Sequence, residues 1–383
     1  MYGIMNIAIE KLMSYMEERT KRGGLVNTKK VISGFTIDII ASTGFATETN
    51  ANDDRAKESP FVKNGLNLFN FNPLKIASIL ALPRPILDFL GFTVPFPEDS
   101  INFFINLTRQ IVLERKKNNV KRNDLIQLMI DTYALEFDGD KDDYSHLMAV
   151  MDEKETLTEQ KQHSTKMKKT LDETEIISQA VLFFIAGFET TASVLTTIFF
   201  EFAHNKEIQE RLFEEVLTIA KNTDTSNLDE YFDQLLKNAP YLNAVVSEAI
   251  RKYPPVVRLE RRVGSDGIKV AGIPVDKGVL IEIPTYAVHH NPEVYPNPEV
   301  FNPDRFMPEN KHLLVPYTYI GFGDGPRNCI GMRFALQEIK LCLGQIVQKY
   351  QFCKAPDTPK TLSFKKGSPM LNTLPFFVKI SKR

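Results

Sequence analysis

The feature that most constrains this chain is a glycine-rich loop with a single cysteine, residues 321–331. It reads Gly-Phe-Gly-Asp-Gly-Pro-Arg-Asn-Cys-Ile-Gly, with Arg327 two residues before Cys329, and a helical pattern follows directly. Free backbone N–H groups at a helix N-terminus favour a thiolate. A thiolate in such a loop is a metal ligand or a nucleophile, whereas a lone cysteine is more often a buried structural residue. Glycines let a flat cofactor approach the backbone, and an arginine can pair with its carboxylate.

The composition limits the class of protein. The 383 residues suffice for one large domain or two ordinary ones, and 43% hydrophobic with 25% charged residues is typical of globular proteins. The net charge of −1 gives no indication of nucleic-acid binding. Three cysteines without a spaced framework favour a reducing compartment. There is no secretory signal and no run of eighteen apolar residues, so no segment is expected to span a bilayer by itself.

The hydrophobic periodicity along the chain predicts a mainly α protein with minor β sheets. A highly charged stretch, 136–172, is interpreted as a long solvated loop. A proline-rich meander is expected at 291–308. The expected helices are 5–22, 28–45, 99–117, 124–133, 173–204, 212–221, 241–253 and from the cysteine loop to about 350, and the expected strands are 268–270, 279–283 and segments within 362–380.

An apolar, aromatic segment over residues 69–96 is interrupted by four prolines. Its pattern predicts two short amphipathic turns. Exposed apolar loops of this kind touch membranes or line a ligand entrance. Packing of the segment onto the core is an equally weighted alternative.

The long helix expected at 173–204 carries polar residues in its apolar middle, in the order Ala186-Gly187-Phe188-Glu189-Thr190-Thr191. A buried acid and a buried hydroxyl are costly unless they have partners. Gly187 weakens a helix by about 1 kcal/mol relative to alanine and leaves a notch for a small molecule. The alternative is a threonine whose hydroxyl bonds back to a carbonyl of its own helix.

Two arginines and a glutamate form a further pattern. Glu248 and Arg251 are three positions apart on a predicted helix, where they face each other, and Arg305 follows in a Pro-Asp-Arg-Phe turn. Taken alone, the first two are a common surface pair. His289 and His290 precede a proline without complementary acids, so a metal-binding role is not expected for them.

Taken together, these motifs resemble those of the cytochrome P-450 family. Phe-x-x-Gly-x-Arg-x-Cys-x-Gly is similar to its haem-binding signature, Ala-Gly-x-Glu-Thr-Thr to its oxygen-activating helix, and Glu-x-x-Arg with Pro-x-Arg-Phe to its structural triad. The resemblance, greatest to animal microsomal enzymes, implies a cytochrome P-450 fold in a single domain over residues 1–383. The first residues already match the middle helices of the family, and Trp is absent. An N-terminally truncated fold, without the membrane anchor, is therefore expected.

The resemblance assigns residues to a haem b cofactor. Cys329 would be the axial ligand of the iron, as its thiolate is in this family. Arg327 would pair with a haem propionate, and Arg261 is a second candidate for that pairing. The other cofactor-binding residues implied by the loop are Phe322, Gly325 and Gly331.

The resemblance also assigns the catalytic and structural residues. Thr190 would donate a hydrogen bond to dioxygen, and Glu189 would help to relay protons. The triad of Glu248, Arg251 and Arg305 would be structural. The residues expected to face substrate are Val256, Val257, Phe183, Phe184, Ile185 and Ala186.

The implied activity is that of a monooxygenase, which inserts one oxygen atom from O2 into a lipophilic small molecule. Electrons would come from NADPH through NADPH-cytochrome P-450 reductase, with cytochrome b5 as an additional candidate partner, and nucleic acid is not expected. By resemblance the protein would lie at the cytoplasmic face of the endoplasmic reticulum membrane, with peripheral contact through residues 69–96. The alternative is a truncated, non-catalytic fragment with weak or no haem binding.

Overall fold

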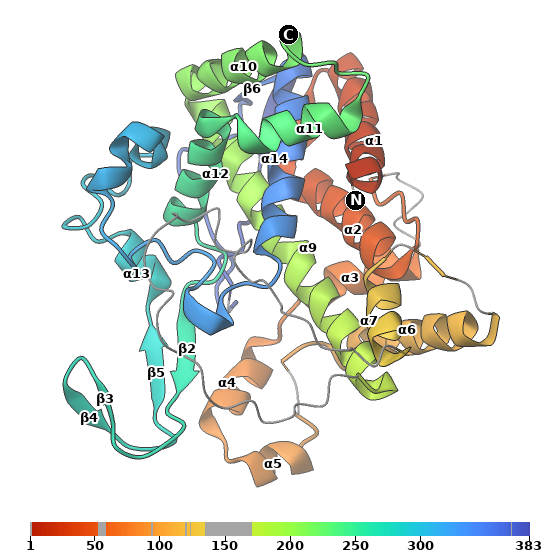
Figure 1. Cartoon of the computed structure of the whole chain (residues 1–383), viewed down its shortest axis with the longest axis vertical. Coiled ribbons are helices and arrows are strands. Elements are labelled where there is room, and N and C mark those ends of the chain that lie inside the picture. The colour runs from red at the N-terminus through yellow and green to blue at the C-terminus, as the bar shows by residue number, and fades with distance from the viewer. Residues whose placement is uncertain are drawn as a thin grey trace.

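The computed structural model describes residues 2–52, 59–92, 95–118, 121–122, 124–134, 171–368 and 370–383. The charged loop expected at 136–172 lies outside the described residues, apart from its last two. The described part is mainly helical with small sheets, as predicted. Figure 1 shows the arrangement of its elements. The helices are α1 (Tyr2–Lys21), α2 (Thr28–Phe45), α3 (Pro60–Leu68), α4 (Pro73–Ala81), α5 (Arg84–Phe89), α6 (Glu98–Asn118), α7 (Leu125–Ala134), α9 (Glu173–His204), α10 (Lys206–Lys221), α11 (Leu228–Lys237), α12 (Pro240–Lys252), α13 (Thr285–His289) and α14 (Met332–Lys349).

The longest described helix, α9, runs diagonally through the middle of the molecule (Figure 1). It begins with a capping box, in which the Asp172 side chain accepts from the Glu175 N–H and the Glu175 side chain accepts from the Asp172 N–H. Both of its ends agree with the sequence prediction. Among the described helices, α9 alone has the length and hydropathy to cross a membrane, but 67% of that apolar window is buried inside the protein. It is therefore the central core helix.

Two clusters of buried side chains lie along α9. The larger one joins its second half to α1, α2, α10, α11, α12 and α14. The smaller one joins its first half to α2, α3, α6 and α7. Phe184 stacks on Phe104 there, with ring centroids 4.2 Å apart, and Phe61 meets both rings edge-on. These contacts fix the position of α9 along its own axis relative to α3 and α6.

The described residues form three small antiparallel sheets. One has the strand order β1-β7-β6, and in it Val26 pairs with Val378. The sheet of β2 and β5 and the hairpin of β3 and β4 extend from the lower end of the molecule in Figure 1. The strands are β1 (Leu25–Asn27), β2 (Leu259–Arg262), β3 (Ile268–Val270), β4 (Ile273–Val275), β5 (Leu280–Ile283), β6 (Tyr350–Lys354) and β7 (Phe377–Lys382), and the short 3-10 helices are η2 (Pro303–Phe306), η3 (Pro308–Leu313) and η4 (Gly325–Arg327).

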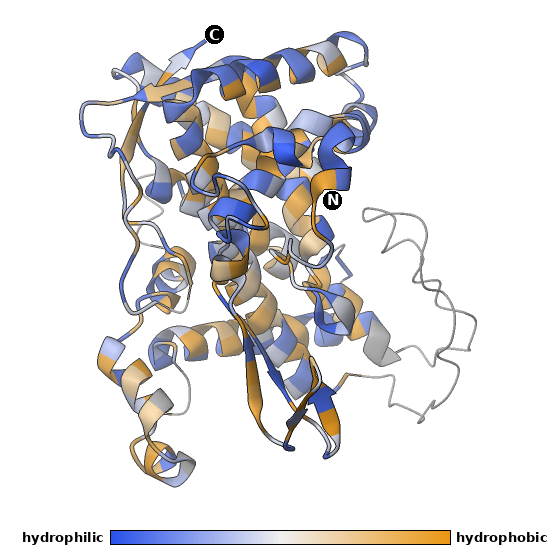
Figure 2. Ribbon diagram, turned by 90° about the vertical axis from the view of Figure 1, so that its left-hand side faces the viewer, coloured by the Kyte–Doolittle hydropathy of each residue, from blue (hydrophilic) through white to orange (hydrophobic). Residues whose placement is uncertain are grey.

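The apolar segment expected at residues 69–96 contains two short helices, α4 and α5. They stand out from the body at its lower end and are mainly apolar in Figure 2. Phe69 and Phe71 are buried in the smaller core cluster, whereas Leu74 is 78% and Phe89 89% exposed. The segment thus packs on the core at its start and presents apolar side chains to the surroundings beyond that point.

Candidate active site

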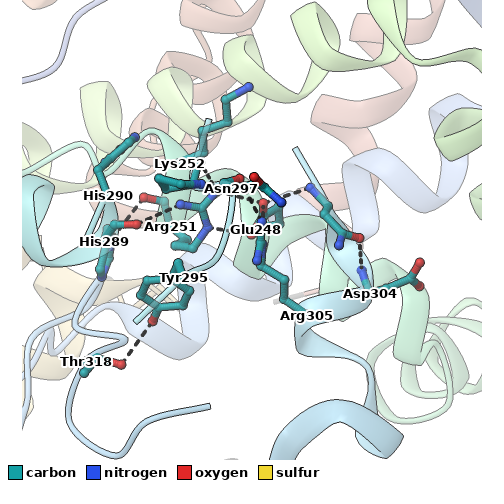
Figure 3. A network of polar contacts seen from close by, with 12 residues as sticks. Glu248, Arg251, Lys252, His289, His290, Tyr295, Asn297, Asp304, Arg305 and Thr318 are labelled. Carbon is teal, nitrogen blue, oxygen red and sulfur yellow. Dashed lines mark hydrogen bonds and ion pairs between the residues drawn. The ribbon is translucent and has the colours of Figure 1, made fainter. Parts of the chain in front are cut away.

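The glutamate and the two arginines of the sequence pattern form a buried polar network (Figure 3). Glu248 and Arg251 are fully buried on α12. Nε and Nη2 of Arg251 donate to the two carboxylate oxygens of Glu248, at 2.7 and 2.8 Å. Arg305 of η2 adds an ion pair, with its Nε 3.6 Å from Glu248 Oε1. The structure therefore brings this predicted triad together, and the surface-pair alternative is wrong.

The same network holds the proline-rich meander in place. Arg251 also donates from Nη1 to the His289 carbonyl at 2.8 Å and from Nη2 to the Pro298 carbonyl at 2.7 Å. The Asn302 N–H donates to Glu248 at 2.9 Å. Each buried charge thus has several partners, as buried ion pairs require. The role of the triad is to fix the chain that leads into the cysteine loop.

The cysteine loop rests on α12 at its start and opens outward at its end. Gly321 is required there, because a Cβ at this position would lie 2.2 Å from Cγ2 of Ile250. The Cys329 N–H donates to the Phe322 carbonyl at 2.8 Å, which closes the loop. Phe322 packs against the larger core cluster, whereas Cys329 and Arg327 are exposed. The loop therefore leaves both its thiol and its guanidinium exposed.

The electrostatics of Cys329 differ from the sequence prediction. The loop was expected to favour the thiolate, yet the protein atoms around the thiol raise the pKa of Cys329 above its ordinary value. The backbone N–H of Gly331 acts in the opposite, predicted direction and is outweighed. Because a metal ion deprotonates the thiol that it binds, coordination by iron is what would supply the thiolate.

The second arginine expected at the cofactor, Arg261, belongs to a strand that contacts the same loop through Leu259. Arg261 and Leu259 are two positions apart on β2, so their side chains share one face of the strand. A side-chain atom of Leu259 lies 3.8 Å from the Cβ position of Gly323 in the loop. Arg261 Nη1 donates to the Glu260 carbonyl at 2.9 Å. Among the described residues, no acid forms an ion pair with Arg261 or Arg327, which leaves both guanidiniums available to carboxylates.

On α9 the acid and the hydroxyl of the motif have separate partners. Thr190 is half-buried and donates from Oγ1 to the Ala186 carbonyl at 2.6 Å, the local bond foreseen as the alternative. Glu189 is buried and forms an ion pair with Lys29 of α2. Lys29 could not be predicted from the sequence, because no pattern links two residues 160 positions apart. Ala186 is exposed one turn before Thr190, so this face of α9 is open.

Two expectations for α9 are wrong. The notch at Gly187 is filled, since Cδ1 of Ile40 lies 3.0 Å from its Cβ position. This glycine lets α2 approach α9 rather than leaving room for a small molecule. Phe184 was expected to face substrate, but it is fully buried in the smaller core cluster.

The residues around the loop fit a haem. The exposed thiol would supply one soft ligand to the iron, the two guanidiniums match two propionates, and the open face of α9 at Ala186 is small and apolar. Among the described residues there is no group of three or more His, Cys, Asp or Glu that could hold a metal ion. This donor set suits a metal that brings most of its own ligands, as the iron of haem does.

Comparison with known proteins agrees with this geometry. A family model described as Cytochrome P450 matches residues 1–380. The chain belongs to the cytochrome P450 family. Its members are haem-thiolate monooxygenases that carry haem b.

Several mammalian relatives match over almost the whole chain. Cytochrome P450 3A7 of Homo sapiens is 35% identical over 97% of this chain and 68% of its own length. Cytochrome P450 3A2 of Rattus norvegicus is 35% identical over 92% of this chain and 64% of its own length. Lithocholate 6-beta-hydroxylase of Mesocricetus auratus is 30% identical over 100% of this chain and 70% of its own length. The chain thus spans about two thirds of the length of the curated relatives it matches.

Proposed function

We propose that this chain uses haem b to insert one oxygen atom from O2 into a lipophilic small molecule. The observation that carries the proposal is the outward-facing thiol of Cys329, in a loop fixed from behind by the buried triad. When bound, haem would supply the activation of dioxygen, and the Cys329 thiolate would hold its iron. Arg327 and Arg261 would hold its propionates by charge-assisted hydrogen bonds.

Thr190 and Glu189 are proposed to deliver protons on the open face of α9. The Thr190 hydroxyl donates to the Ala186 carbonyl in this structure and would rotate to donate toward that face. Glu189 is held by Lys29, whose side chain is 18% exposed and therefore reaches solvent. A proton could enter from water beside Lys29 and pass through the Glu189 carboxylate, which makes the pair an inlet to the site.

The substrate is proposed to enter between α9 and the segment that follows α12. Val256 is 39% exposed and forms an isolated β-bridge with Met370, which places the C-terminal part of the chain beside it. Val257, Phe183 and Ile185 are half-buried. Steroid acids are the first substrate class to test, because one relative is named a lithocholate hydroxylase.

The redox partner and the location are part of the proposal. A reductase that takes electrons from NADPH would dock on the side of the cysteine loop, with cytochrome b5 as a second candidate. The exposed apolar side chains of α4 and α5 would rest on the cytoplasmic face of the endoplasmic reticulum membrane. Replacement of both Leu74 and Phe89 by aspartate should reduce sedimentation with phosphatidylcholine vesicles, and unchanged sedimentation would remove the contact from the proposal.

The decisive experiment is the visible spectrum of the purified protein, reduced with dithionite and exposed to carbon monoxide. A strongly red-shifted Soret band that Cys329→Ala abolishes would establish a thiolate-bound haem. A chain without haem, or with an unshifted band, would be the non-catalytic fragment of the alternative. Oxidation of steroid acids would then be measured with a reductase and NADPH.

A further inference from the structure

His289, the last residue of α13, is fully buried and has a polar partner at each ring nitrogen. The Ile320 N–H donates to Nε2 at 3.0 Å. Nδ1 lies 3.1 Å from the Arg251 carbonyl, which can only accept, so Nδ1 carries the hydrogen. The two contacts together fix one neutral tautomer of the ring. Ile320 immediately precedes the cysteine loop, and Arg251 belongs to the buried triad.

We propose that His289 is a positioning residue for the iron ligand: its neutral imidazole ties the start of the cysteine loop to the backbone of α12. The inference rests on the proposed function, in which Cys329 binds the iron. His289 itself touches neither the cofactor nor the reacting atoms.

The contacts of the ring show how it fixes the loop. Its plane lies 9° from that of Tyr319, with centroids 5.7 Å apart, so the imidazole engages two successive residues, Tyr319 and Ile320. The Ile320 carbonyl accepts from the Gly323 N–H at 3.0 Å. Two residues after Ile320, the Phe322 carbonyl accepts from Cys329. A shift at Ile320 is thus passed to the cysteine through two backbone hydrogen bonds.

Every charged or titratable group around the ring favours the neutral form or is already paired. Arg251 and His290 repel a proton on the ring, and the positive charge of Arg251 is engaged by Glu248. The Tyr295 ring meets the imidazole nearly perpendicularly, with centroids 6.2 Å apart. Burial lowers the pKa of His289 to about 4. The Nε2 lone pair is therefore available to Ile320 at neutral pH.

Two substitutions separate the two hydrogen bonds of the His289 ring, the one with the Ile320 N–H and the one with the Arg251 carbonyl. In His289→Gln, the side-chain amide can reach the place of Nε2 and offer an oxygen to the Ile320 N–H. In His289→Asn, the amide reaches only the place of Nδ1, so the loop loses its partner while Arg251 keeps a donor. His290→Asn is the matched control, because His290 is bonded to the Tyr286 carbonyl and not to the loop.

The experiment is amide hydrogen exchange on the purified protein. In His289→Asn, we expect the amides of residues 319–331 to exchange at least tenfold faster than in the unchanged chain. Amides of α9 should change little, and both His289→Gln and His290→Asn should stay near the unchanged protection. Equal protection of 319–331 in the Asn and Gln variants would overturn the proposal. Equally faster exchange in α9 would do so too, because it would show loss of global stability instead.

A spectroscopic measurement tests whether the His289–Ile320 hydrogen bond affects the binding of iron by Cys329. In His289→Asn, the fraction of bound haem with the red-shifted carbon monoxide band should fall, and His289→Gln should restore it. An unchanged fraction in the Asn variant would show that the cysteine does not depend on the tie. If the unchanged chain binds no haem, the proposed function fails, while hydrogen exchange still decides whether His289 holds the loop.

Discussion

Two buried glutamates of this molecule, Glu248 and Glu189, differ in how many partners hold their carboxylates. Glu248 is fully buried on α12, and its carboxylate receives hydrogen bonds from Arg251 and the Asn302 N–H and an ion pair from Arg305. Glu189 is 4% exposed on α9, and among the described residues Lys29 is its ion-pair partner. A carboxylate with several fixed partners is part of the framework. A carboxylate held by one cation from another helix has fewer contacts to break, which is compatible with the proposed proton relay.

The largest expected effect is that of Glu248→Ala. It leaves the Arg251 guanidinium buried without its main partner, and breaking a buried ion pair costs about 3–5 kcal/mol. The free energy of unfolding, measured by urea denaturation, should fall by that amount.

The exposed ion pair between Glu18 of α1 and Arg22, the first residue after that helix, offers a control, with Arg22 Nη2 2.6 Å from Glu18 Oε1. Glu18→Ala should cost about 0.5 kcal/mol or less. If the two alanine variants unfolded at the same urea concentration, the framework role of Glu248 would be wrong.

A smaller loss is expected for Lys29→Met. The Glu189 carboxylate then loses its cation, and an unpaired buried group costs about 1–3 kcal/mol. Urea midpoints of the variant and the unchanged chain measure the loss.

A double variant tests whether Lys29 acts through this pair. Addition of Glu189→Gln to Lys29→Met should recover much of the lost stability, since the amide carries no charge and needs no cation. Strictly additive losses would mean that Lys29 stabilises the fold by other contacts.

The smallest effect on stability is expected for Thr190→Ala, whose hydroxyl bonds only to its own helix in this structure. The melting temperature should change little, because alanine favours helices and the lost bond is local. Product formed per NADPH consumed should fall severalfold once the proton donor is gone. Ser178→Ala removes the same kind of bond from an exposed position of α9 and should leave this ratio unchanged. Full coupling in Thr190→Ala would contradict the relay.

The sequence predicted those parts of the fold whose signals are local. The bounds of α2 and α9 were correct because Asn27 and Asp172 cap their first turns. The helix expected at 212–221 begins earlier, at Lys206, because the chain resumes a helix directly after α9. The helix α11 was missed despite its Asn227 cap, which shows that a short amphipathic helix gives a weak signal.

Contacts between distant residues could not be predicted in this way. The loop motif identified Cys329 as the candidate ligand, but nothing near it in the sequence indicated His289, which lies 31 positions before Ile320. The site roles of Phe322, Gly325, Arg327, Gly331 and Arg261 stay predictions, as does the single domain over residues 1–383. Burial of Phe184 rather than exposure to substrate depended on Phe104, brought in by α6.

The order of strands in the sheet of β1, β7 and β6 delays its assembly during synthesis of the chain. Leu25–Asn27 pair with Phe377–Lys379, so about 350 residues must be made before the first strand meets its partner. At a synthesis rate of about 5–20 residues per second, this wait lasts about 20–70 s. Closing so long a loop costs about 5 kcal/mol of chain entropy, which the last strand must offset once it leaves the ribosome. Throughout that interval the nascent chain presents an unpaired strand edge, the kind of surface that chaperones cover.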